Sequence, residues 1–200
     1  MRTNLLSFLT FFLRLLPFFI VCYFLLLSMF SQDFKGLIYL VGLIFTIFTV
    51  IVLGNALPIS KPLDINGITN KDLCNFITFN NVGEISRLPL GQAVLGYTFS
   101  YLLVSIIKYN YVKQNISTII LFPLLILFDM AWDVKNSCHT VWQEGVSLFI
   151  SLLLGLLWGV IINSTNNKKL VFLTGINNKE TCVTPANRSF LCKKKGKNKS

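Results

Sequence analysis

The chain has 200 residues, of which 54% are hydrophobic and 13% are charged, and its formal net charge is +10. Its mean hydropathy of +0.66 is too high for a soluble core of this size, so the composition excludes an ordinary soluble globular domain. The polar residues stand in blocks, and the long apolar stretches between them indicate a helical membrane protein.

Five apolar stretches reach or approach the roughly 20 residues that a helix needs to cross the hydrocarbon core. In chain order they are residues 5–30, 37–57, 88–107, 116–132 and 145–162, and the second, third and fifth contain no charged residue. We therefore predict an all-α, polytopic membrane bundle of about five transmembrane helices over residues 1–162. A basic tail rich in Asn, Lys and Ser follows over residues 163–200, and this composition predicts disorder.

The first stretch, residues 5–30, contains Arg14 and Pro17. One tilted and kinked span accommodates both residues, and an interfacial segment followed by a shorter span from Leu15 is the alternative. A cleaved signal peptide is disfavoured, because the apolar region is too long and no small-x-small site follows it. We expect a single span.

The basic residues indicate an orientation in the membrane. With five spans, the loops 58–87 and 133–144 share one side and the tail lies on the other. Nine of the 18 Lys and Arg residues follow Ile162, and a lysine-rich tail after the last span is typical of the cytoplasmic side. We predict an integral membrane protein with a cytoplasmic tail that meets membrane lipids. Nucleic acid is disfavoured as a partner, because no aromatic residues are interleaved with the final lysines.

The five cysteines show no C-x-x-C spacing, which argues against a zinc site, and we expect no metal and no cofactor. Cys74 and Cys138 fall in two loops on the same predicted side. Free thiols are the simpler reading, and a disulfide between the two is the alternative if that side is oxidising.

Two polar motifs stand at the starts of spans. Residues 86–105, SRLPLGQAVLGYTFSYLLVS, open a span with Pro-x-Gly-Gln, and residues 132–161, WDVKNSCHTVWQEGVSLFISLLLGLLWGVI, open another with His-x-x-x-Gln. These motifs resemble the second and third signatures of the phosphatidic acid phosphatase type 2/haloperoxidase superfamily, and HTVWQ is closest to its dolichyl-diphosphatase-like branch. The resemblance covers roughly residues 55–162 and implies a bundle with its site on one membrane face.

The resemblance implies roles for individual residues. In that family the third-signature histidine attacks phosphorus, an acidic neighbour orients it, and a second-signature histidine protonates the leaving group. Position by position, His139 takes the place of the nucleophile and Gln143 that of the orienter, while Pro89 and Gly91 match the second signature. The candidates for substrate binding are Lys61, Arg87, Gly91, Gln92 and Lys135.

Departures from the family pattern disfavour catalysis. Gln92 replaces the acid histidine, and glutamine cannot protonate a leaving group, which typically costs about 10²–10⁴ in rate. Asp133 replaces a phosphate-binding arginine, and a carboxylate repels a phosphoryl group. Leu90 replaces the signature serine, and Gly54 stands where the first-signature lysine belongs.

We therefore expect a lipid-phosphatase-like scaffold that is catalytically inactive and binds lipids, including phosphorylated head groups, or partner helices. One alternative is a divergent lipid-phosphate or polyisoprenyl-diphosphate phosphatase that uses His139 as its nucleophile. A second alternative is a small channel or membrane-structuring protein.

A packing explanation exists for several of the same residues. Small and polar side chains recur every four positions, at His139, Gln143, Ser147, Ser151, Gly155 and Gly159 in the last span and at Gln92, Gly96 and Ser100 in the third. Such stripes allow helices to approach closely, within one chain or in an oligomer. Asp129 and Glu144 lie near span ends, where we expect them to reach water rather than to form a proton relay.

Overall fold

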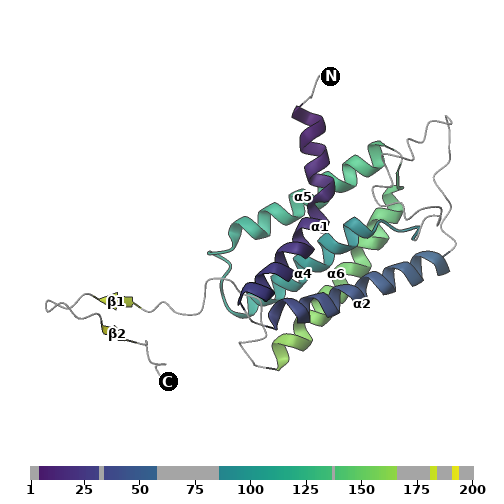
Figure 1. Cartoon of the computed structure of the whole chain (residues 1–200). Helices are drawn as coiled ribbons and strands as arrows, with labels where there is room; N and C mark the ends of the chain where they lie inside the picture. Colours follow the sequence, from purple (N-terminus) through teal and green to yellow (C-terminus); the bar gives the residue numbers. More distant parts are fainter. Residues whose placement is uncertain are drawn as a thin grey trace.

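The computed structural model of the chain describes residues 5–31, 34–57, 86–136, 138–165, 181–183 and 191–193. Within these ranges the chain forms five helices (Figure 1). They are α1 (Leu5–Ser31), α2 (Lys35–Ala56), α4 (Leu90–Lys108), α5 (Ile116–Lys135) and α6 (Val141–Ser164). The last four are long and apolar enough to cross a membrane, which agrees with a helical membrane bundle.

The first predicted span is one continuous helix, α1, with Pro17 inside it. Figure 1 shows its N-terminal end rising away from the other helices. The apolar segment described within it, Leu15–Phe30, is shorter than a full span requires. The single helix is therefore confirmed, whereas a complete crossing of the membrane by α1 stays a prediction.

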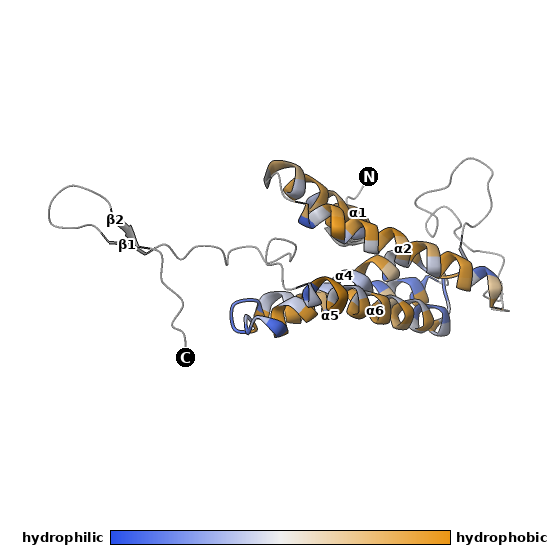
Figure 2. Cartoon of the chain, turned by 90° about the horizontal axis from the view of Figure 1, so that it is seen from below, coloured by the Kyte–Doolittle hydropathy of each residue, from blue (hydrophilic) through white to orange (hydrophobic). Residues whose placement is uncertain are grey.

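The helices form two layers, with α1 and α2 in one layer and α4, α5 and α6 in the other (Figure 2). The bundle has two ends, which we name by their contents. The motif end contains Pro89 and Thr140, because the Ser147 hydroxyl of α6 donates to the Pro89 carbonyl at 2.8 Å. The tail end contains Lys108 and Ser164. Both motif segments thus share one end, as the alternation of spans predicts.

Helices α4 and α6 run parallel and form the most extensive helix pair of the bundle. Gly96 packs on Ser151, Gly155 on Ser100 and Tyr97, and Gly159 on Val104. A Cβ atom at Gly155 would lie 2.6 Å from the Tyr97 carbonyl oxygen, so the backbones approach closely only because this position is glycine. The predicted stripe of small residues is confirmed as an interface within the chain.

Three buried tyrosines join the two layers. The rings of Tyr97 and Tyr101 on α4 stack at 6.1 Å, and Tyr39 on α2 lies 5.5 Å from Tyr97. The Tyr97 hydroxyl donates to the Tyr39 carbonyl at 3.0 Å, and the hydroxyls of Tyr39 and Thr98 share a hydrogen bond of 2.7 Å. Aromatic bulk fills the core while the hydroxyls of Tyr39 and Tyr97 find partners, whereas the buried Tyr101 hydroxyl finds none among the described residues.

The outward faces of the helices are apolar, as the orange ribbon in Figure 2 shows. The exposed large side chains of α2 include Leu37, Val41, Ile44, Phe45, Phe48 and Val52, and those of α5 include Ile116, Ile120, Leu121, Leu124, Leu127 and Phe128. Apolar patches of this extent are rare on soluble monomers. They are compatible with an integral membrane protein whose outer surface meets lipid.

The tail contains two short strands, β1 (Thr181–Val183) and β2 (Leu191–Lys193), which pair antiparallel with Cys182 opposite Cys192. Beyond Thr165 the structure describes only these two segments of the tail, so the predicted disorder of the tail stays a prediction. Their residues include Thr, Val and Leu, which suit a strand better than the surrounding Asn and Lys. The rest of the tail after Thr165 lies outside the described residues.

Candidate functional site

The start of α6 is fixed by a capping box between Thr140 and Gln143. The Thr140 hydroxyl oxygen accepts from the Gln143 backbone N–H at 3.3 Å, and the Gln143 side-chain oxygen accepts from the Thr140 backbone N–H at 2.8 Å. This pair satisfies two N–H groups that a helix start leaves without partners. An orienting role for Gln143 would need the same oxygen to accept from the imidazole of His139, so capping and orientation compete.

His139 lies directly before this cap, at the motif end, and is half-buried. Its neighbour Cys138 is disulfide-bonded. The disulfide, which the sequence offered only as the alternative to free thiols, is therefore present at Cys138, but its candidate partner Cys74 lies outside the described residues, and so does the candidate Lys61.

The start of α4 carries the second motif. Pro89 precedes the helix in an extended conformation, with φ −67° and ψ 115°. Gly91 faces α1 and α5, because a Cβ atom there would lie 3.6 Å from Pro17 Cγ and 3.9 Å from Asp129 Oδ2. Gln92 is fully buried, and its side-chain nitrogen donates to the Ile126 carbonyl of α5 at 3.5 Å. The second motif therefore faces α5.

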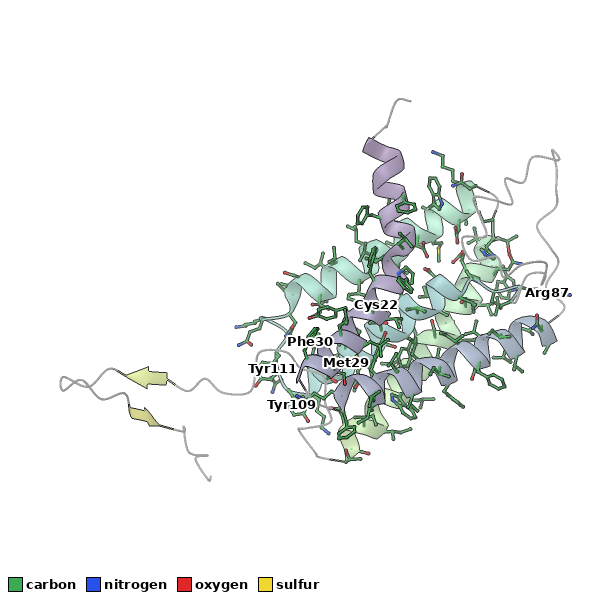
Figure 3. The ribbon with its side chains drawn as sticks, viewed as in Figure 1. Cys22, Met29, Phe30, Arg87, Tyr109 and Tyr111 are labelled. Atoms are coloured by element: carbon green, nitrogen blue, oxygen red, sulfur yellow. The ribbon has the colours of Figure 1, made fainter. Side chains whose placement is uncertain are left out.

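The candidate cations stand apart from these motifs. Arg87 and Lys135 are both exposed. Figure 3 shows Arg87 at the edge of the motif end, with Met29, Phe30, Tyr109 and Tyr111 at the opposite, tail end. The structure thus buries Gln92 and Gln143 and half-buries Gly91, but it leaves Arg87 and Lys135 at the surface.

A cluster of carboxyl groups lies beside the motifs, and sequence reasoning missed it. Glu144 is 0% exposed, and the charged groups that act on it are Asp133, which is 8% exposed, and Asp129. The expectation that Glu144 reaches water is therefore wrong, because the first turn of α6 directs its side chain toward α5. The spacing of Asp129 and Asp133 gave a signal, since residues four apart share one face of a helix.

Among the described residues, the charged groups that act on Glu144 are carboxyl groups. Neither of its side-chain oxygens accepts a hydrogen bond from an ordinary donor among the described residues, and the same holds for the Gln92 side-chain oxygen. The carboxyl group of Asp133 lies within hydrogen-bonding reach of Glu144. In the described part of the chain, no three His, Cys, Asp or Glu side chains converge as a metal site would require.

This arrangement has a clear electrostatic character. Carboxylates in a poorly solvated place repel an anion by about 4 kcal/mol at 4 Å when the effective dielectric constant is near 20. No family model, curated protein or solved structure matches this chain, so its functional assignment rests on its own residues and their geometry.

Proposed function

We propose that this chain is a multi-pass integral membrane protein on a lipid-phosphatase-like scaffold that does not hydrolyse phosphate esters and acts by binding membrane lipids. The observation that carries the proposal is the buried carboxyl group of Glu144, with Asp133 beside it, at the end that holds His139. A phosphatase of this kind needs cations at that place to stabilise the phosphoryl oxygens.

The contact between the two motif-bearing helices supports the scaffold. The resemblance requires the starts of two spans to meet on one face. The hydrogen bond from Ser147 to the Pro89 carbonyl joins the start of α6 to the start of α4. Helices α4 and α6 carry the two motif segments that the resemblance depends on.

Three further observations support the loss of catalysis. Gln92 is buried against α5 and has no proton to give to a leaving group. The side-chain oxygen of Gln143 already accepts from the Thr140 backbone N–H. Arg87 and Lys135 are exposed rather than directed into the interior.

Hydrolysis is tested directly by measuring phosphate release from phosphatidic acid and from a polyisoprenyl diphosphate in detergent micelles. We expect neither the wild type nor His139→Ala to exceed a mock-purified control, while a known lipid phosphatase in the same micelles proves the assay. The proposal is overturned if the wild type releases phosphate and His139→Ala does not, because the divergent phosphatase would then be the correct function.

The use of the small-residue stripe supports lipid, rather than a second copy, as the main partner. Gly96, Gly155 and Gly159 all lie in the α4–α6 interface and are therefore not available to a second copy. The opposite face of α6 instead presents large apolar side chains, among them Phe149, Leu153, Leu156, Leu157 and Val160. Side chains of this size pack against acyl chains and lack the small residues that favour close helix association.

The disulfide of Cys138 supports a cytoplasmic tail. Disulfides persist on the oxidising side of a membrane, and Cys138 lies at the motif end, opposite the tail. This assignment agrees with the lysine-rich composition of the tail.

A membrane-impermeant maleimide reports this orientation. We expect no reaction of Cys182 and Cys192 in intact cells and clear reaction after digitonin opens the plasma membrane. Cys138 is expected to react only after reduction, and the free thiol of Cys22 within α1 serves as the shielded control. Labelling of the tail cysteines in intact cells, or only after complete solubilisation, would reverse the orientation.

A further inference from the structure

We propose that Cys182 and Cys192 are a redox-active dithiol that closes a disulfide bond between β1 and β2 when the tail is oxidised. The site lies in the basic tail, after the last helix, and the lipid-binding proposal makes no use of it. The inference rests on the proposed function only for the cytoplasmic position of the tail.

The first argument is the register of the two strands. Strands β1 and β2 pair antiparallel (Figure 1), and Cys182 is the direct partner of Cys192. Directly opposed residues of an antiparallel pair have Cα atoms about 4.5 Å or about 5.5 Å apart, depending on whether that pair is hydrogen-bonded. A disulfide bond usually joins Cα atoms that are about 4.4–6.8 Å apart. Either type of pair therefore allows the bond without a movement of the backbone.

This register is specific for the two cysteines. The neighbouring partners are Thr181 with Lys193 and Val183 with Leu191. A slip by one residue would bring each cysteine opposite a different residue type, and it would place the two cysteines on opposite faces of the strand pair. The register in the structure is thus the one in which a cross-strand bond can form.

In the proposed orientation, the membrane separates this pair from the other cysteines. Cys22 is a free thiol within α1, and Cys138 is disulfide-bonded at the motif end. Cys74 lies on the same predicted side of the membrane as Cys138. Cys182 and Cys192 are therefore the two cysteines of the cytoplasmic side, and each is the nearest oxidation partner of the other.

The second argument is that the bond would decide whether the strands stay paired. Each strand has three residues, and an isolated two-stranded pair is at best marginally stable in water. A disulfide bond across the pair reduces the number of conformations that the chain between the two cysteines adopts when the strands separate. Oxidation therefore fixes the paired strands, and reduction returns them to an equilibrium with the unpaired chain.

The third argument is the charge of the sequence around β2. Lys193, Lys194 and Lys195 follow Cys192 directly, and Arg188 precedes it by four residues. A cluster of positive charges attracts anions and raises their rate of encounter. Glutathione disulfide carries a net negative charge, so it is a suitable oxidant for this site.

The reaction consists of two thiol–disulfide exchanges. The thiolate of one cysteine attacks a sulfur of glutathione disulfide, forms a mixed disulfide and releases one glutathione. The thiolate of the other cysteine then attacks the bonded cysteine sulfur and releases the second glutathione. Two electrons pass from the cysteines to glutathione disulfide, and the two thiol protons end on the released glutathiones. The excess of reduced glutathione in a cytoplasm reverses both steps.

Peptide mapping of the full-length chain tests the proposal. The purified chain in detergent is equilibrated with glutathione mixtures of increasing oxidised fraction and is then trapped with N-ethylmaleimide. Trypsin cuts after Lys179, Arg188 and Lys193, so the two cysteines fall in separate peptides, 180–188 and 189–193. By mass spectrometry we expect both peptides to be alkylated in the reducing mixtures and joined by a disulfide bond in the oxidising mixtures.

A variant with a shifted cysteine separates the strand register from closeness along the chain. Cys182→Ser combined with Val183→Cys moves the thiol by one position, to the residue that pairs with Leu191. The loop to Cys192 becomes one residue shorter, which hardly changes the entropy of closing it. The shifted thiol should therefore need a larger oxidised fraction of glutathione than the wild type, while the melting temperature of the helical bundle in detergent stays the same.

Three results would overturn the proposal. They are the absence of the joined peptides in every glutathione mixture, a bond from either peptide to Cys74 or Cys138 instead, and equal midpoints for the wild type and the shifted variant. Phosphate release by the wild type, or maleimide labelling of the tail in intact cells, would overturn parts of the proposed function without changing the joined peptides. The two failures are therefore distinguishable.

Discussion

Replacing Tyr97 with alanine is expected to lower the free energy of unfolding by about 3–5 kcal/mol, the usual cost of removing a large buried aromatic side chain. Tyr97 is 0% exposed, stacks on Tyr101, and donates its hydroxyl proton to the Tyr39 carbonyl. Its loss empties the centre of the bundle and leaves the Tyr39 carbonyl without this donor. Melting temperature in detergent, followed by size-exclusion chromatography, measures the effect.

Two further variants serve as references for the loss of stability in Tyr97→Ala. Tyr97→Phe keeps the ring and removes one hydrogen bond, so its cost should be near 1 kcal/mol. Tyr23→Ala removes the same side chain from a position that is 54% exposed and should change the melting temperature far less. Equal melting temperatures for Tyr97→Ala and Tyr23→Ala would contradict the assignment of Tyr97 to the core.

Replacing Gly155 with alanine is expected to destabilise the chain by about 1–3 kcal/mol, as overpacking of a close interface typically does. The added Cβ atom would meet the Tyr97 carbonyl oxygen at 2.6 Å and the Tyr97 Cα atom at 3.1 Å. These are backbone atoms of α4, so the clash cannot be relieved by rotating a side chain. The two helices must separate, and the melting temperature should fall.

The same substitution at Gly145, in the same helix, is the matched control. A Cβ atom there meets nothing within 4 Å, so Gly145→Ala should be neutral or should stabilise α6 by up to about 1 kcal/mol through helix propensity. If both variants melt at the same temperature, the close α4–α6 contact is not what holds the bundle together.

The helices were predictable because hydropathy alone fixes their approximate extent. The apolar runs 88–107 and 145–162 became α4, Leu90–Lys108, and α6, Val141–Ser164. The small-residue stripe was also readable, since a spacing of four keeps Ser151 and Gly155 on one face of a helix. The sequence could not show that this stripe forms a contact within the chain, because the same pattern also occurs at the interfaces of helical oligomers.

The burial of Glu144 could not be predicted from the sequence. A glutamate near the end of a span usually reaches water, and nothing local to Glu144 indicates otherwise. Its burial follows from the place of α5 against α6, which brings Asp133 to it. The four-residue spacing of Asp129 and Asp133 indicates only that they share one face of α5; which helix that face contacts is decided by the tertiary packing. The two strands β1 and β2 were not predicted for another reason. Three-residue strands are too short to alter the composition of the tail.

The parallel pairing of α4 and α6 also has a consequence for biogenesis. Pro89 meets Ser147, which is made 58 residues later, so α4 is synthesised before its partner. Thr98, Ser100 and Ser105 donate their hydroxyl protons to carbonyls of their own helix, four residues earlier. The hydroxyl donors of α4 are therefore already hydrogen-bonded within the helix when it enters the bilayer. Helix α6 then packs against this preformed surface.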